Sequence, residues 1–248
     1  MKNQYIGDIN DYVKYGLILS IAEIFSKKIL FVWMLTKDDE SLYGGQTTYL
    51  KSEKYRGYNP GLFDVLKDIV KSNIRNNTEI TAIEENELFK KYKFEFIHDI
   101  IEDNKKSRED YFKRVYESVE KNDIIFFDPD NGLEVKSHKK GNKNSSKYVY
   151  WDEVKEVYRR KKNLLIYQHF PHVPKEEYLK KRVKECRAEL NINNEAEIIS
   201  IKTKNVVFFF IVQNDINLIE KLKDELKKWR KEMDIVIHTK KKASNSTL

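Results

Sequence analysis

Residues 123–136 read DIIFFDPDNGLEVK, an apolar run that ends abruptly in polar residues. The apolar part has the length of a strand that is buried on both faces, as in a parallel sheet flanked by helices. Asp128, Pro129 and Asp130 follow this strand directly, and Glu134 and Lys136 come shortly after. Because open α/β sheets bind ligands beyond the carboxyl ends of their strands, this junction is the first candidate for a functional site.

Strand and helix patterns alternate on both sides of this stretch. Helical spacing of apolar residues predicts helices over 10–25, 59–74, 107–122, 150–161, 174–190 and 216–229. Apolar runs predict strands over 28–35, 123–128, 163–169, 195–203, 205–213 and 234–239, with two short strands around a turn within 80–100. This alternation predicts an α/β protein with a mostly parallel sheet and helices on both faces.

The composition favours a soluble protein with an anionic partner. The chain has 47 Lys and Arg against 40 Asp and Glu, a net charge of +7, which favours nucleic acid, although a lysine-rich solvated surface gives the same value. A single cysteine, Cys186, excludes a disulfide within the chain. We find neither an apolar run of about 20 residues nor a signal peptide, and therefore expect a cytoplasmic protein without a membrane span. We expect one domain over 1–239 and a disordered basic tail over 240–248.

The polar residues after the 123–128 strand fit two kinds of chemistry. A carboxylate at Asp128, in a turn fixed by Pro129, can accept a hydrogen bond from a substrate amine, as methyl transfer to an exocyclic amine requires. Alternatively, Asp128 and Asp130 would bind Mg²⁺, and Glu134 and Lys136 would complete a metal-dependent nuclease site. Only three residues separate Asp130 from Glu134, too few for the strand, turn and strand that usually carry such acids. PDNG is also a typical turn sequence.

Polar residues also follow the neighbouring predicted strands. Thr36 follows the strand over 28–35, and the strand over 163–169 ends in Gln168 and His169, with His172 close behind. The loop over 137–151 offers Lys147 for phosphates and Tyr148 for base stacking. We interpret five of these residues as candidate substrate contacts: Lys147, Tyr148, Gln168, His169 and His172. The histidine pair lacks a third ligand, so no metal site is predicted there.

The segment GDINDYVKYGLILSIAE, residues 7–23, resembles the adenine-N6 methyltransferases of large-subunit ribosomal RNA and the related three-Cys-motif partner proteins. The resemblance places Gly7, Asp8, Asp11 and Lys14 on the cofactor side. Thr36, which follows the first strand, is a further candidate contact to the cofactor. It makes Asp128 and Pro129 the start of the catalytic motif. It implies a Rossmann-like, class I methyltransferase-like fold and S-adenosylmethionine as the cofactor.

The chain departs from that family at two places. After its first strand the family has Asp-Thr-His-Ala-Gly-x-Gly, whereas this chain has MLTKDDESLYGG over 34–45. Asp130 stands where the catalytic motif has a second proline, and no aromatic residue follows it. The open question is whether Asp11, Thr36 and Asp128 border a pocket or whether Trp33 and Met34 fill it. The segments GDINDYVKY, FFDPDNGLEV, SSKYVYWDEV and YQHFPH together also resemble one bacterial family, which implies no function.

These observations predict an enzyme that acts on nucleic acid and uses S-adenosylmethionine to methylate a base amine. RNA, single-stranded DNA or a flipped base is the expected substrate, since a paired base hides its amine. Two alternatives stay open: a Mg²⁺-dependent nuclease or phosphodiesterase that uses Asp128, Asp130, Glu134 and Lys136, and a non-catalytic module that binds nucleic acid.

Overall fold

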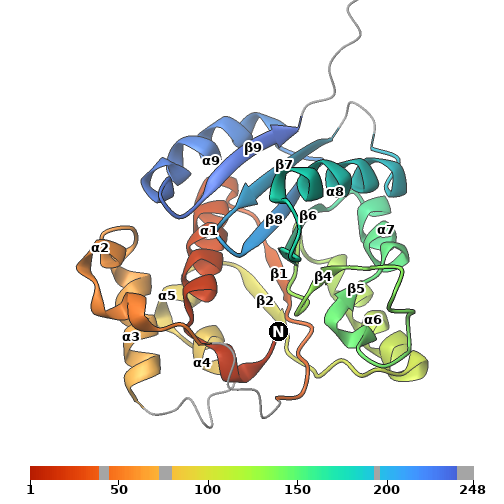
Figure 1. The fold of residues 1–248 in the computed structure, drawn as a ribbon, viewed down its shortest axis with the longest axis horizontal. Helices are drawn as coiled ribbons and strands as arrows, with labels where there is room; N and C mark the ends of the chain where they lie inside the picture. The colour runs from red at the N-terminus through yellow and green to blue at the C-terminus, as the bar shows by residue number, and fades with distance from the viewer. Residues whose placement is uncertain (39–44, 73–79, 193–195, 239–248) are drawn as a thin grey trace, which may run out of the picture.

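The computed structural model describes residues 1–38, 45–72, 80–192 and 196–238. The predicted tail over 240–248 lies outside them. Within the described residues, seven strands form one sheet in the order β2-β1-β3-β6-β8-β7-β9 (Figure 1). The strands are β1 (Ile29–Val32), β2 (Phe94–Ile97), β3 (Ile124–Phe127), β6 (Asn163–His169), β7 (Glu197–Lys202), β8 (Val206–Val212) and β9 (Asp234–His238). The short strands β4 (Gly132–Leu133) and β5 (Tyr148–Val149) pair with each other beside it.

The sheet is mixed, which corrects part of the prediction. Neighbouring strands are parallel from β2 through β1 and β3 to β6, and antiparallel from β6 through β8 and β7 to β9. The reason is local: only residues 203–205 join β7 to β8, and so short a connection forces a hairpin. The predicted α/β class is confirmed, whereas "mostly parallel" holds for one half of the sheet.

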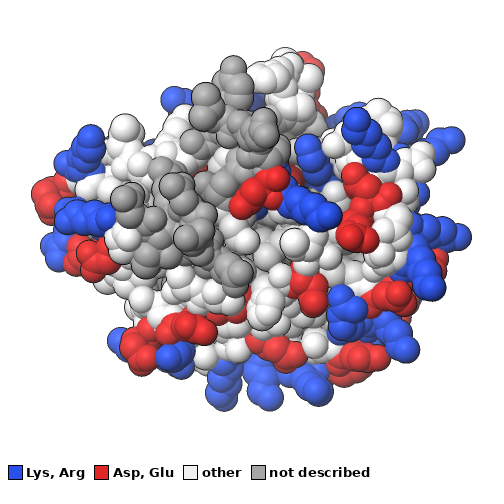
Figure 2. Space-filling model, turned by 90° about the horizontal axis from the view of Figure 1, so that it is seen from below, with Lys and Arg blue, Asp and Glu red and all other residues white. Residues whose placement is uncertain are grey.

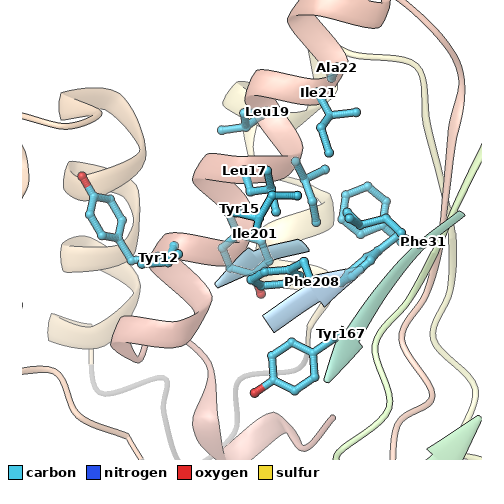
Figure 3. Packing of buried hydrophobic residues seen from close by; sticks show 14 of the residues in the cluster. Tyr12, Tyr15, Leu17, Leu19, Ile21, Ala22, Phe31, Tyr167, Ile201 and Phe208 are labelled. Atoms are coloured by element: carbon cyan, nitrogen blue, oxygen red, sulfur yellow. The ribbon is translucent and has the colours of Figure 1, made fainter. Parts of the chain in front are cut away.

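Helices cover both faces of the sheet (Figure 1). On one face lie α1 (Ile9–Phe25), α2 (Glu53–Arg56), α3 (Pro60–Lys71), α4 (Thr81–Glu84), α5 (Glu87–Lys90) and α9 (Ile219–Glu225). On the other lie α6 (Lys105–Val119), α7 (Trp151–Arg159) and α8 (Lys175–Glu189). Alternate residues of each strand supply the two cores: in β3, Phe126 packs on the α1 face and Phe127 on the α6 face. Figure 3 shows the α1 side, where Leu17 and Ile21 face Phe31.

One predicted strand between residues 80 and 100 is wrong. Residues 81–90 form α4 and α5, and only β2 is a strand. Asn86 begins α5 by accepting a hydrogen bond from the backbone amide of Leu88. Ile83 and Phe89 are buried against the α1 face, so this segment meets the core through helical turns. Its apolar residues are too few for periodicity to distinguish short helices from strands.

The connections place a crevice at one edge of the sheet. After β1 the chain crosses to β2 on one side, and after β3 it crosses to β6 on the other. The strand order therefore reverses between β1 and β3, which is where open α/β sheets bind ligands. The amino terminus lies beside the carboxyl ends of these two strands (Figure 1). Among the described helices, none has both the length and the apolar character needed to cross a bilayer.

Candidate functional site

A cavity of about 480 Å³ lies at the point where the strand order reverses. Four parts of the chain line it: the segment before and within α1, the turn after β3, the loop directly before β5, and the end of β6. The predicted site residues in its wall are Asp8, Asp11, Lys14, Asp128, Pro129, Asp130, Lys147 and His169. Residues from both ends of the sequence thus meet at one place.

Lys14 links the amino-terminal motif to the turn after β3. Its Nζ lies 2.7 Å from Asp11 Oδ1 and 2.8 Å from Asp128 Oδ2, and all three side chains are buried. Burial lowers the pKa of Lys14, but the charges of Asp11 and Asp128 outweigh this and raise it above its ordinary value. Burial raises the pKa of Asp128 despite the nearby charge of Lys14.

The start of α1 holds this triad in place. Asp8 is the N-cap, and its Oδ1 accepts a hydrogen bond of 2.9 Å from the Asp11 amide. Lys14 lies one helical turn after Asp11, so both side chains project from the same side of the helix. Asp11 Oδ2 accepts from the amide of Gly7, whose φ of +81° favours glycine. Gly7 therefore supports the site from behind and does not line the cavity.

The amino group of Met1 occupies a cage of oxygen atoms beside Asp128. It donates to the carbonyls of Met34 and Asp128, both at 3.1 Å, and to that of Trp33 at 3.4 Å. It also lies 2.8 Å from Asp130 Oδ1. Met34 has a φ of +48°, which is unusual for a residue other than glycine and turns the chain directly after β1. The carboxyl ends of β1 and β3 thus form a binding place for a primary ammonium group.

Asp130 completes this cage and connects it to Thr36. Asp130 Oδ2 accepts a hydrogen bond of 2.7 Å from Thr36 Oγ1. Burial alone would raise the pKa of Asp130. The Met1 ammonium group and the Thr36 hydroxyl outweigh this effect, so the pKa of Asp130 lies below its ordinary value. Thr36 lines a second cavity of about 490 Å³, which shares Lys2 and Lys147 with the first.

Trp33 and Met34 do not fill the site. Both are completely buried, and they point into opposite cores: Trp33 packs on the α1 face and Met34 on the α6 face. The cavity beside Asp11 and Asp128 is therefore open. Residues 39–44, which make up much of the segment in place of the glycine-rich turn, lie outside the described residues.

Five predicted site residues lie away from the cavity. The Glu134 carboxylate accepts from the amide of Trp151, the first residue of α7, and Lys136 is exposed on the loop after β4. Tyr148 stacks on His138, and His172 is exposed. Gln168 holds the neighbouring backbone in place. Its side chain accepts a hydrogen bond from the Leu133 amide and donates to the Asn131 and His169 carbonyls. The structure thus separates Glu134 and Lys136 from Asp128 and Asp130.

Lys147 is held at the cavity by its backbone. Its carbonyl accepts from the amide of Asn131, directly after Asp130. The buried guanidinium of Arg108 donates to the carbonyls of Ser145 and Tyr148 on either side, and it pairs with Glu153 at 2.6 Å. These contacts fix the loop that carries Lys147 to α6 and α7.

The cavity also has lining residues that were not among the predicted site residues, namely Met1, Lys2, Tyr5, Asn10, Asn131 and Tyr167. For Tyr167 a signal was present. Side chains alternate along a strand, so Tyr167 and His169 face the α1 side, whereas Gln168 faces the other. The sequence contains no such signal for Met1, because its position depends on the tertiary fold.

Comparisons with known proteins assign neither a family nor a function to this chain. A comparison with protein families, with curated proteins and with solved structures finds no significant match to this chain. Within the described part of the chain, no group of three or more His, Cys, Asp or Glu side chains is arranged to hold a metal ion. Figure 2, seen from below relative to Figure 1, shows Lys and Arg interspersed with Asp and Glu. The site's own chemistry therefore carries the functional argument.

Proposed function

We propose that this protein is an S-adenosylmethionine-dependent methyltransferase that acts on an exocyclic amine of a nucleic-acid base. The observation that carries the proposal is the ammonium cage at the ends of β1 and β3, directly beside Asp128. The second argument for the proposal is that Asp8, Asp11 and Lys14 match the motif of the ribosomal RNA methyltransferases that the segment resembles.

The Met1 amino group serves as a stand-in for the α-ammonium group of the cofactor. Both are primary ammonium groups on the Cα of a methionyl unit, and both need hydrogen-bond acceptors only. The cage supplies three carbonyl oxygens and the Asp130 carboxylate, so the donor set fits. Trp33, Met34, Asp128 and Asp130 would hold the cofactor once Met1 leaves. The cofactor, when bound, supplies an electrophilic methyl group.

Asp128 has the chemistry to position the amine that receives the methyl group. Oδ2 pairs with the Lys14 ammonium group at 2.8 Å, and both side chains are buried. Burial raises the pKa of Asp128, and a more basic carboxylate is a stronger acceptor for the N–H of an amine. Pro129 fixes the backbone directly after it. Asp128 is thus the acceptor, and Lys14 holds its carboxylate in place.

The sheet order supports the finer fold assignment. A strand inserted antiparallel between the last two parallel-running strands, as β8 is between β6 and β7, is similar to the second half of class I methyltransferases. A nucleic-acid substrate is favoured by the net charge of +7 and by Lys2, Lys37 and Lys147 in the second cavity.

The geometry favours methyl transfer over phosphodiester hydrolysis. Asp128 and Asp130 face the cations Lys14 and Met1, and Glu134 stabilises the start of α7. A hydrolytic site would need these acids to gather around a shared metal ion. A non-catalytic module, in turn, gives no reason for the buried triad of Lys14, Asp11 and Asp128 at the edge of a cavity.

Transfer of labelled methyl groups tests the proposal. Purified protein is incubated with methyl-labelled S-adenosylmethionine and total RNA or single-stranded DNA, and the nucleosides are separated and identified by mass spectrometry. We expect an N-methylated amino base from the wild type and at least a 100-fold lower rate for Asp128→Ala, since a positioned acceptor contributes about 10²- to 10⁴-fold. Asp64→Asn, a surface change on α3, is the control. Label in no nucleic acid, or label that persists in Asp128→Ala, would overturn the proposal.

A further inference from the structure

Two polar atoms in the cavity wall have no partner among the described residues. Asp128 is 2% exposed, and its Oδ1 accepts no hydrogen bond from any of them, because Lys14 engages Oδ2. Tyr167 is 9% exposed, and its hydroxyl likewise bonds to none of them. Both residues line the cavity, so a ligand bound there can reach both atoms.

The two residues are neighbours across adjacent strands. Phe127 of β3 pairs with Ile166 of β6, so the next residues, Asp128 and Tyr167, lie side by side at the ends of the strands. Both face α1: Asp128 contacts Lys14, and Tyr167 lies with its ring centroid 5.9 Å from Lys14 Nζ. Figure 3 shows the Tyr167 hydroxyl pointing away from the packed core. Paired residues on adjacent strands have Cβ atoms about 5 Å apart, so one small ring can reach both.

The two atoms have opposite hydrogen-bonding roles. The Asp128 carboxylate, which pairs with Lys14, serves as an acceptor. The Tyr167 hydroxyl stays protonated, because burial and then the charge of Asp128 raise its pKa well above its ordinary value. A neutral hydroxyl can donate. The pair therefore fits a ligand edge that presents an N–H donor next to an acceptor.

We propose that Tyr167 determines base specificity by donating a hydrogen bond to the ring nitrogen adjacent to the amine that Asp128 accepts from. This inference rests on the proposed function and narrows its substrate to adenine or cytosine, whose amino group stands beside an unprotonated ring nitrogen on the Watson–Crick edge. Guanine has a protonated ring nitrogen, N1, beside its amino group on that edge. Uracil and hypoxanthine place a carbonyl oxygen there instead. That oxygen would face the carboxylate of Asp128, which cannot donate, so these bases are rejected.

Nucleoside analogues and one hydroxyl deletion test the inference. Binding of adenosine and cytidine is measured by calorimetry with excess S-adenosylhomocysteine, which keeps adenosine out of the cofactor position. Each is compared with an analogue that has CH in place of the ring nitrogen, 1-deazaadenosine or 3-deazacytidine. Tyr167→Phe removes only the hydroxyl. Tyr15→Phe is the matched control, because it also removes one hydroxyl, which is buried without a partner among the described residues and lies outside the cavity lining.

We expect the wild type to bind at least one of the two nucleosides about 3- to 10-fold more tightly than its deaza analogue, the range for one neutral hydrogen bond. Tyr167→Phe should abolish this difference, and Tyr15→Phe should preserve it. The inference is overturned if Tyr167→Phe weakens nucleoside and analogue equally, if it leaves both unchanged, or if the wild type binds neither nucleoside at millimolar concentration.

The same titrations separate this inference from the proposed function. If S-adenosylhomocysteine gives no binding heat but Tyr167→Phe still abolishes the preference for the ring nitrogen, methyl transfer is wrong and the role of Tyr167 stands. If S-adenosylhomocysteine binds and the preference is absent in the wild type, the cofactor assignment stands and the role of Tyr167 is wrong.

Discussion

Replacing Lys14 with methionine should destabilise the fold by about 3–5 kcal/mol, the range observed when one partner of a buried ion pair is removed. Methionine has nearly the shape of the lysine side chain, so the change removes the charge and leaves the packing. Lys14 is 3% exposed and contacts Asp11 at 2.7 Å and Asp128 at 2.8 Å. Without it, two buried carboxylates face each other.

The loss should depend on pH in a defined direction. In Lys14→Met, Asp128 loses the cation that opposes the effect of burial, so its folded-state pKa rises further above the unfolded value of about 4. A carboxyl group whose pKa is raised by folding binds more protons in the folded state than in the unfolded state. Stability therefore decreases as the pH rises from the unfolded-state pKa to the folded-state pKa. The deficit relative to the wild type should be small near pH 4 and largest near pH 8.

Urea unfolding followed by circular dichroism measures this effect, with Lys27→Met as the control. Lys27 pairs with Asp215 at 3.3 Å, but the pair is about a third exposed and should contribute less than about 1 kcal/mol. The double variant Lys14→Met/Asp128→Asn should recover part of the loss, because it removes one of the unpaired charges. A loss for Lys14→Met no larger than that for Lys27→Met, or one independent of pH, would refute the account of the triad.

Two further predictions concern stability. Burial and then the charge of Asp11 raise the pKa of Asp8 from 3.8 to about 7, so wild-type stability should decrease from pH 4 to pH 7 by about 4 kcal/mol at most. Asp8→Asn keeps the N-cap and removes the charge, so in urea unfolding it should match the wild type near pH 4 and exceed it near pH 8; equal stability at both pH values would argue against a raised pKa. Gly132→Ala should lower the melting temperature by about 4–8 °C, since strain at such a φ costs about 2 kcal/mol. Its φ is +124°, and a Cβ would lie 2.4 Å from Gln168 Oε1; a melting temperature within a degree of the wild type would contradict this.

Local patterns were sufficient for most of the fold. The predicted strand over 163–169 and the strand β6 coincide, because NLLIYQH is continuous in apolar residues and bounded by polar ones. The helix over 10–25 begins within one residue of α1. Residues 81–90 were mistaken for a strand because the core selects their conformation. The position of β8 between β6 and β7 is a property of the whole sheet, which strand patterns do not contain.

The site could be predicted where polar side chains directly follow a predicted strand. Asp128 and Asp130 followed from this rule, and Lys14 followed from the family resemblance alone, since 114 positions separate it from Asp128. Glu134 and Lys136 were placed in the cluster by proximity in sequence, but β4 carries them away from the cavity. Tyr167 was missed because it lies within its strand rather than after it.

The ammonium cage is the central claim, and calorimetry with S-adenosylhomocysteine tests it most directly. The account predicts binding to the wild type with a dissociation constant in the micromolar range, weakened about 10-fold or more by Asp130→Asn, since a hydrogen bond to a charged group contributes about 1.5–3 kcal/mol. 5′-Methylthioadenosine, which lacks the amino-acid part, should bind both forms equally. No binding at millimolar ligand, or an equal loss of both ligands in Asp130→Asn, would contradict the account.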